Sequence, residues 1–286
     1  MKAISFTKKQ ENLIGSFLIA ILFAVLVFAV YTFLPVHENA NPPITWGWGV
    51  DWKVNIRPPA IDLISGRTPY IDSTICYPPW IYLLVSPLTA LPPDFVAALL
   101  FVLTYMVYLF VILRLKATPW AASAFMVNRF IFNNAINANL DFLAVLGFAL
   151  PPQIGLFFVL SKPQIGIGIA LFWLVEAWRK GKIREVIRVF APVTLAYLLS
   201  FLIYGLWPLK VAGMTNNPYN ASLWPVGIPV GIILLYKAFH NKNPILAMGA
   251  SPFLAPYVNI TSFAVTLIPF IPNSMLMLVV SALTWL

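Results

Sequence analysis

The stretch "FVAALLFVLTYMVYLFVILRLK" (residues 95–116) contains no charged side chain before Arg114. An uninterrupted apolar run of about 20 residues is what an α-helix needs to cross the hydrocarbon core of a bilayer. Arg114 and Lys116 follow at once, as basic residues do where a membrane helix reaches the headgroups. The stretch therefore predicts a transmembrane helix and sets the fold class of the whole chain.

The composition agrees with a membrane protein. Of the 286 residues, 60% are hydrophobic and 9% are charged, and the mean hydropathy is +0.86. This is more apolar surface than a soluble fold can hide. We predict an all-α polytopic membrane protein, residues 1–286 forming a single transmembrane domain of about 8 to 10 membrane segments, several of them discontinuous.

The net charge is +9, but the basic residues form short clusters beside apolar runs and no extended basic face. This placement does not favour nucleic-acid binding and instead predicts how the chain is oriented in the membrane. One cluster, in residues 2–9, precedes the first apolar run at 13–34, which reads as a retained signal anchor. The densest cluster lies in residues 179–188. Both should be cytoplasmic, with residues 35–76 forming an outer loop that contains an interfacial helix. The expected location is the plasma membrane, with the N-terminus in the cytoplasm.

Proline breaks interrupt the middle of the chain. Residues 140–150, 152–160 and 165–178 are apolar, but a proline pair and the sequence "SKPQ" separate them. Each piece is too short to cross a bilayer alone. Proline removes a backbone donor and disfavours helix in the residue before it, so these pieces predict discontinuous helices around a polar cavity.

The outer loop gathers four of the nine acidic residues, namely Glu38, Asp51, Asp62 and Asp72. Asp51 is either a solvated or helix-capping aspartate, or a general base whose pKa is raised by neighbouring tryptophans. Asp62 and Asp72 read more simply as the wet side of an interfacial helix. Their spacing matches no compact metal loop, so we expect no metal and no required cofactor.

A second candidate group lies beyond the middle of the chain. Lys162 is the only charged residue between Asp141 and Glu176. It either neutralises the C-terminus of a helix or binds a phosphate in a low-dielectric site. Asn139 and Asp141 either cap the helix that follows or line the same cavity. Signatures of soluble enzymes such as a P-loop, GxGxxG, CxxC and HExxH are missing.

The sequence "DWKVNIRPPAIDLISGRTPYIDSTICYPPWIYLLVSPLTALPP" (residues 51–93) carries a family pattern. An Asp opens an outer loop, a Gly and "PY" follow, and "YPP" leads into a short helix with a proline before "LP". It resembles the start of GT-C superfamily glycosyltransferases, most closely the polyprenyl-phosphate-mannose-dependent mannosyltransferases of glycosyltransferase family 87. "NANLDFLAVLG" (137–147), "LSKPQIGIGIALFWLVEAWRKGK" (160–182) and "SPFLAPY" (251–257) resemble later blocks of the family.

The resemblance implies a GT-C-like fold and a chemical reaction. The family's outer-loop aspartate, here Asp51, would take the proton of an acceptor hydroxyl, which attacks the sugar with inversion while lipid phosphate leaves. Lys162, with Arg57 or Arg67, would offset the charge on that phosphate. The other implied substrate-binding residues are Tyr70, Tyr77, Asn139 and Asp141. Implied partners are membrane lipids and polyprenyl phosphate, and the donor sugar that the resemblance implies is mannose.

Two alternatives stay open. Family members carry His or Asp after the Ser-Pro segment, whereas this chain reads "YVNITSF" (257–263), with Asn259 the nearest polar residue. The chain also stops at "SALTWL", which indicates a truncated bundle or one completed by a protein partner at the C-terminal helices. The second hypothesis is therefore a non-catalytic membrane subunit of the same fold. A transporter comes third, since no internal repeat supports duplicated halves.

Overall fold

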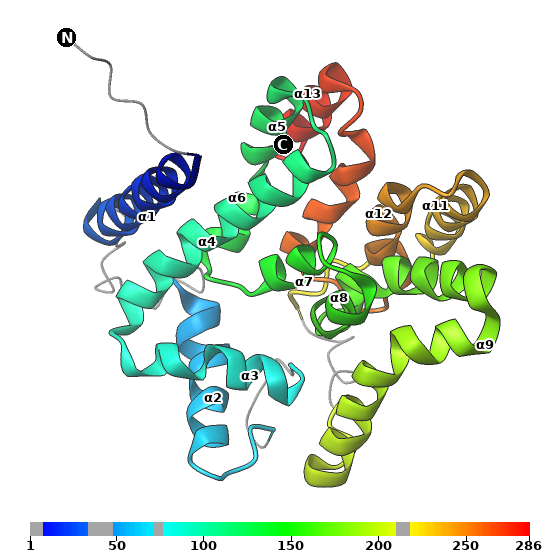
Figure 1. Ribbon diagram of the computed structural model, residues 1–286, viewed down its shortest axis with the longest axis horizontal. Coiled ribbons are helices and arrows are strands. Elements are labelled where there is room, and N and C mark those ends of the chain that lie inside the picture. The colour runs from blue at the N-terminus through cyan, green and yellow to red at the C-terminus, as the bar shows by residue number, and fades with distance from the viewer. Residues whose placement is uncertain (1–7, 34–47, 71–76, 210–217) are drawn as a thin grey trace.

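The computed structural model describes residues 8–33, 48–70, 77–209 and 218–286, and these residues form helices and turns (Figure 1). Within these ranges the only β pairing is an isolated antiparallel bridge between Asn220 and Asn259. The prediction of an all-helical chain is confirmed. Residues 35–47 and 71–76 of the predicted outer loop, with Glu38 and Asp72, lie outside the described residues.

The elements follow one another in this order. The N-terminal half contains α1 (Lys8–Phe33), the π-helix η1 (Asp51–Ile56), α2 (Arg57–Ile64), α3 (Pro79–Val85), the 3₁₀ helix η2 (Ser86–Ala90), α4 (Pro93–Arg114), α5 (Pro119–Met126) and α6 (Arg129–Ile136). The C-terminal half contains α7 (Asp141–Gly147), α8 (Pro152–Val159), α9 (Pro163–Tyr204), α11 (Ile228–Asn241), α12 (Pro244–Leu254), the 3₁₀ helix η4 (Ile260–Phe270) and α13 (Ser274–Leu283).

In the described part of the chain, α4 and α9 are the two helices long and apolar enough to cross a membrane. α9 has 42 residues but consists of two arms, because Gly181 (φ −153°) and Lys182 (φ +51°) leave helical geometry. The bend is visible in Figure 1 and falls within the predicted basic loop. The second arm exposes large apolar side chains, among them Leu202 at 87%. These helices favour membrane association, and the larger number of segments stays a prediction.

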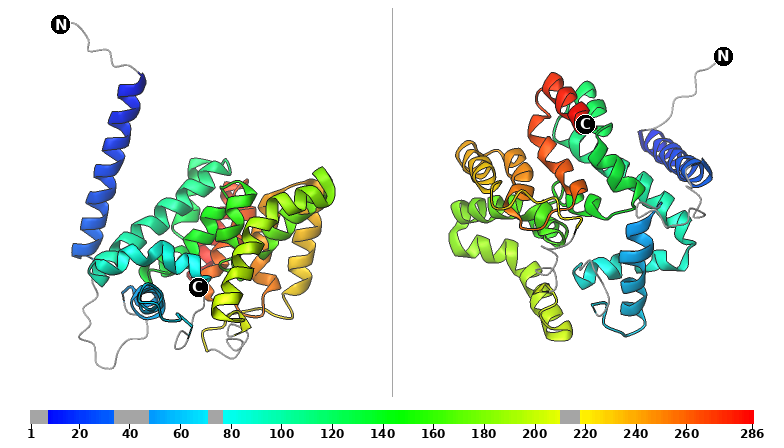
Figure 2. Two further views of the ribbon diagram at one scale, coloured as in Figure 1. Left: turned by 60° about the horizontal axis from the view of Figure 1, so that its bottom comes forward. Right: turned by 180° about the vertical axis from the view of Figure 1, so that it is seen from behind.

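α1 lies at the edge of the bundle (Figure 2). It packs on α4, where the rings of Tyr31 and Phe95 are 5.9 Å apart. Much of its described surface is apolar and exposed, with Phe28 67% and Phe33 84% accessible. An apolar helix with one covered side suits a lipid environment.

α7 and α8 form a short helical hairpin. They have 7 and 8 residues, so each rises only about 10 to 12 Å, too little to cross a bilayer. A Cβ added at Gly147 would lie 2.9 Å from the carbonyl oxygen of Gly155, which shows how closely the two helices approach. The helix breaks predicted at residues 151–152 and 161–164 are present, whereas the third predicted piece, 165–178, is part of the longer α9. The hairpin returns the chain so that Lys162 lies beside Asp141.

Side-chain caps set where several of the short helices begin. Asn128 accepts a hydrogen bond from the backbone N–H of Ile131 at 3.0 Å, and other helices start in the same way. Such a cap stabilises a helix by about 1 kcal/mol. The other capping residues are Thr118, Asn243, Asn259 and Asn273.

Replacing Gly168 with Ala should destabilise the bundle. A Cβ at this position would lie 2.2 Å from the carbonyl oxygen of Ala247 in α12, and the Gly168 N–H donates to Ser251 Oγ at 2.9 Å. The substitution would push α9 away from α12, at a cost of about 1 to 3 kcal/mol. Thermal unfolding of the purified protein in detergent measures the loss.

Gly66→Ala is the matched control for Gly168→Ala. A Cβ at Gly66 meets no atom within 4 Å, so the cost is confined to its φ of +75°, about 1 kcal/mol. Equal melting temperatures for Gly168→Ala and the wild type would contradict the close α9–α12 contact.

Candidate functional site

Charged, amide and phenol side chains from separate segments meet in one buried group. Asp51 opens η1, Tyr77 precedes α3, Asn139 and Asp141 stand at the start of α7, and Lys162 precedes α9. We call these five residues the Asp51 cluster. Each is less than 9% exposed. The structure thus brings together five residues that were predicted for the site.

Two amide groups bind the Asp51 carboxylate. Asn139 donates through Nδ2 to Oδ2 at 2.7 Å, and Asn55 donates through Nδ2 to Oδ1 at 2.9 Å. Asp51 itself is 8% exposed. Its carboxylate is therefore both oriented by hydrogen bonds and largely withdrawn from solvent.

The backbone before η1 places Asp51. Gly49 has a φ of +67°, and a Cβ there would lie 2.6 Å from the Cβ of Ala97 on α4, so only glycine fits. The N–H groups of Gly49 and Asp51 donate to the carbonyls of Ile136 and Asn137 at 2.8 and 2.9 Å. These contacts hold the start of η1 between α4 and the end of α6.

Lys162 and Asp141 form an ion pair inside the protein, with side-chain exposures of 7% and 0%. Lys162 Nζ also donates to Asn139 Oδ1 at 2.6 Å and lies 5.1 Å from the centre of the Tyr77 ring. Buried charges are tolerated only when they are paired and hydrogen-bonded. Lys162 is thus held by protein groups, and its strongest partner is Asp141.

Two hydroxyls complete the surroundings of Asp141. Thr261 and Ser262, from η4, donate to Asp141 Oδ2 at 3.2 and 3.0 Å. Neither was predicted for the site. Asn259, singled out in the sequence, caps η4 by accepting from the Thr261 N–H at 3.1 Å. The sequence feature that could have identified Thr261 and Ser262 is their adjacency shortly after the "SPFLAPY" block, since neighbouring hydroxyls in an apolar run need buried partners.

Asn139 links the carboxylate of Asp51 to the ion pair. Its Oδ1 accepts from Lys162 and from the backbone N–H of Asp141 at 3.1 Å, while its Nδ2 faces Asp51. Ala138, just before it, has a φ of +52°, which costs a residue with a Cβ about 1 to 2 kcal/mol. The amide is therefore held in one orientation, with its donor side toward Asp51.

The other three predicted residues lie around or apart from the cluster. The Tyr70 hydroxyl donates to the carbonyl of Tyr77 at 2.8 Å and so helps to fix the backbone of a cluster residue. Arg57 donates to the carbonyl of Thr89 at 3.3 Å, and its buried Nε has no hydrogen-bond partner. Arg67 is exposed and pairs with Asp62 at 2.5 Å. Among the described residues, no hydrogen bond or ion pair joins either arginine to the cluster.

Burial raises the pKa of Asp51 above its ordinary value, because the charged form loses water. The Lys162 ammonium and the amide donors of Asn55 and Asn139 oppose this shift, while the negative charge of Asp141 adds to it. A carboxylate with a raised pKa is a stronger base than an exposed one. The arrangement is suited to taking a proton from a hydroxyl.

No metal site is evident in the described part of the chain, where no three His, Cys, Asp or Glu residues gather closely enough to bind an ion. Together with Asn55, Thr261 and Ser262, which contact it, the cluster offers two carboxylates, two amides, an ammonium and three hydroxyls. No family model, curated protein sequence or solved structure matches the chain.

Proposed function

We propose that the protein is a multi-pass plasma-membrane glycosyltransferase that moves a sugar, with mannose the first choice, from polyprenyl phosphate to a lipid or glycan hydroxyl. The Asp51 cluster would face the outer leaflet, and the N-terminus the cytoplasm. Asp51 accepts the proton of the acceptor hydroxyl. The acceptor oxygen then bonds to the anomeric carbon, and the bond from that carbon to the phosphate oxygen breaks, so polyprenyl phosphate leaves with the electron pair.

The observation that carries this proposal is the buried Asp51 carboxylate with a raised pKa, held by Asn139, which in turn contacts the Lys162–Asp141 pair. A general base needs such a position and such a pKa to act near neutral pH. The resemblance of residues 51–93 to a lipid-phosphate-dependent family points to the same residue.

The contacts of Lys162 favour a different role from the one expected. Its ammonium already binds Asp141 and Asn139, so it positions the amide that holds Asp51. With Asp51 and Asp141 ionised, the cluster carries a net negative charge, which would repel a phosphate. We therefore assign the lipid phosphate to Arg57, whose buried Nε is unpartnered and whose helix follows directly on η1.

Purified protein reconstituted in liposomes tests the proposal. Polyprenyl-phosphomannose is added with extracted membrane lipids as acceptors, and the release of polyprenyl phosphate is measured together with mannosylated lipid. Protein-dependent release of both products supports the proposal. Release equal to that of protein-free liposomes, with all lipid-phosphate sugars tried, would reject it.

The rate of transfer should rise with pH along an acid limb that belongs to Asp51. Because burial raises its pKa, the limb should lie above the value near 3.9 of a free aspartate, and activity is lost as the pH falls through it. kcat/KM measured from about pH 4 to 8 reports this limb. Asn55→Leu removes a donor that lowers the pKa and should move the limb further up. A profile that is flat across this range would contradict the assignment.

A non-catalytic subunit is the second candidate, because both oxygens of Asp51 already accept hydrogen bonds within the chain. α13 also exposes apolar side chains, with Met275 71% and Leu283 57% accessible, and this surface fits a partner protein as well as lipid. Stoichiometric co-purification with one partner, together with no turnover of any donor, would favour this candidate.

A further inference from the structure

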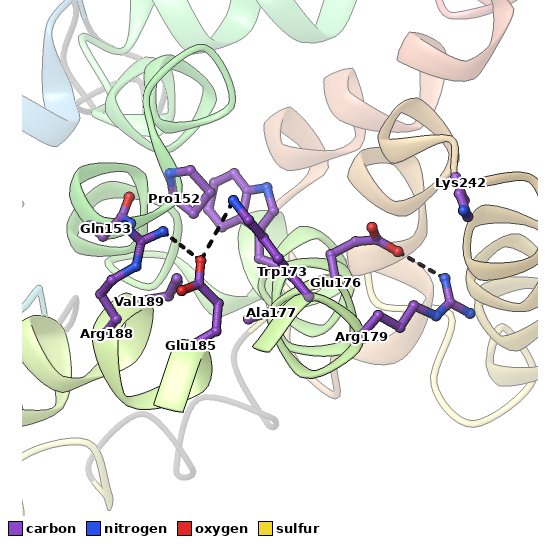
Figure 3. Close-up of a pocket in the computed structure, with 11 residues that line it drawn as sticks. Pro152, Gln153, Trp173, Glu176, Ala177, Arg179, Glu185, Arg188, Val189 and Lys242 are labelled. Atoms are coloured by element: carbon purple, nitrogen blue, oxygen red, sulfur yellow. Dashed lines mark hydrogen bonds and ion pairs between the residues drawn. The ribbon is translucent and has the colours of Figure 1, made fainter. Parts of the chain in front are cut away.

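A second site lies at the bend of α9. Here the structure has a cavity of about 500 Å³, lined by the start of α8, both arms of α9 and Lys242 at the end of α11 (Figure 3). The first arm of α9 separates it from the Asp51 cluster, since the 18 residues from Pro163 to Lys180 rise about 27 Å. Its charged lining residues are Glu176, Arg179, Lys180, Glu185, Arg188 and Lys242.

The cavity is a consequence of local backbone geometry. The break at Gly181 and Lys182 folds the second arm back, so that side chains of both arms line the same space. They are Glu176, Ala177, Arg179 and Lys180 of the first arm and Glu185, Arg188 and Val189 of the second. Trp173 contributes an aromatic wall. It packs closely on α8, because a Cβ added at Gly155 would lie 2.8 Å from its ring. The wall is thus rigid and apolar, and the rim is charged.

The lining carries more positive than negative charge, with four cations against two glutamates. Arg179 binds Glu176 at 2.8 Å and the carbonyl of Phe239 at 3.0 Å, and Arg188 binds Glu185 at 2.5 Å. Lys242 has no hydrogen bond or ion pair within the described residues, and its left-handed backbone (φ +50°) ends α11 at the rim. Lys180 lies 3.9 Å from Glu185. Two oriented guanidinium groups, this ammonium and the unpaired ammonium of Lys242 therefore line one cavity.

We infer that this cavity binds the phosphate headgroup of an anionic membrane phospholipid. Guanidinium groups match the geometry of phosphate oxygens, and an ammonium adds a point charge. The surface beside the cavity is apolar, with Trp178 50%, Ile183 60% and Ile187 57% exposed, as acyl chains attached to the headgroup require. The apolar surroundings favour a lipid over free phosphate.

Lipid binding to the purified full chain tests this inference. The protein in detergent is titrated with phosphatidylglycerol or phosphatidylcholine, and bound lipid is counted by native mass spectrometry. The triple variant Arg179→Gln, Arg188→Gln and Lys242→Gln should bind phosphatidylglycerol at least about tenfold more weakly. The control Lys182→Gln, Arg184→Gln and Lys237→Gln removes the same charge outside the cavity. It should change binding by less than about threefold.

Several outcomes would overturn the inference. Equal losses in the two triple variants would mean that general surface charge, and not the cavity, attracts the lipid. Equal binding of phosphatidylcholine would remove the preference for anionic lipid. Displacement of the lipid by millimolar inorganic phosphate would assign the site to a free anion. If the triple cavity variant fails to fold, the single variant Lys242→Gln decides, because this exposed, unpaired side chain supports no other residue. Unchanged affinity of Lys242→Gln for phosphatidylglycerol would then count against the site.

Discussion

Asp51→Asn should abolish sugar transfer and leave the protein folded. Asparagine has the shape of aspartate but does not accept the acceptor's proton, so the rate should fall by about 10² to 10⁴-fold. Asparagine can lose one amide hydrogen bond, but as a neutral side chain it avoids the cost of burying a charge. Because these two effects offset each other, the stability of the protein should change little. Release of polyprenyl phosphate in liposomes measures the activity, and the melting temperature in detergent reports folding.

Asp62→Asn is the matched control for Asp51→Asn. It makes the same chemical change 11 residues further along, at a side chain that is 38% exposed and whose carboxylate pairs with Arg67. A surface pair contributes little, and we expect transfer within about twofold of the wild type. Transfer retained in Asp51→Asn would remove Asp51 as the base, and equal losses in both variants would point to a general effect on the loop.

Asp141→Leu should cause the largest loss of stability. It removes the partner of the buried Lys162 ammonium and leaves the Ser262 hydroxyl without its acceptor. The Thr261 hydroxyl loses Asp141 and keeps Asn259 Oδ1 at 3.3 Å. Breaking a buried ion pair from one side costs about 3 to 5 kcal/mol, because the remaining charge is uncompensated. Equilibrium unfolding in mixed detergent micelles measures this free energy.

The double variant Asp141→Leu with Lys162→Met separates the charge effect from the loss of packing. Methionine is of similar length and removes the buried charge, so the double variant should be more stable than Asp141→Leu alone. Additive losses would show that the unpaired ammonium is not the cause. A loss below about 1 kcal/mol in Asp141→Leu would mean that Lys162 reaches water or another partner.

The helical architecture could be predicted because its causes are local. The apolar run at 95–116 and the proline pair at 151–152 act on neighbouring residues, and α4 and the α7–α8 hairpin lie where these signals place them. The break at Gly181 was not predicted as a bend within one helix, although the basic loop around it was. Glycine permits many backbone angles, and packing selects among them.

The candidate site could be predicted only by residue type. Asp51 was recognisable as the aspartate that opens the 51–93 block. Asn139, Asp141 and Lys162 were recognisable because polar groups in apolar segments need partners. Which partner each one binds depends on contacts between distant segments. Thr261 lies 120 residues from Asp141 along the chain, and no local pattern links the two.

Hydropathy and proline placement were thus sufficient to predict an all-helical chain and its discontinuous middle, since both act within a few residues. Folding in three dimensions decided the rest. It paired Lys162 with Asp141 and placed the same ammonium against Asn139, whose amide binds Asp51. It also folded α9 back on itself to form the basic cavity. The ion pair forms because a buried charge needs a partner. The bend of α9 forms because close packing selects which segments meet.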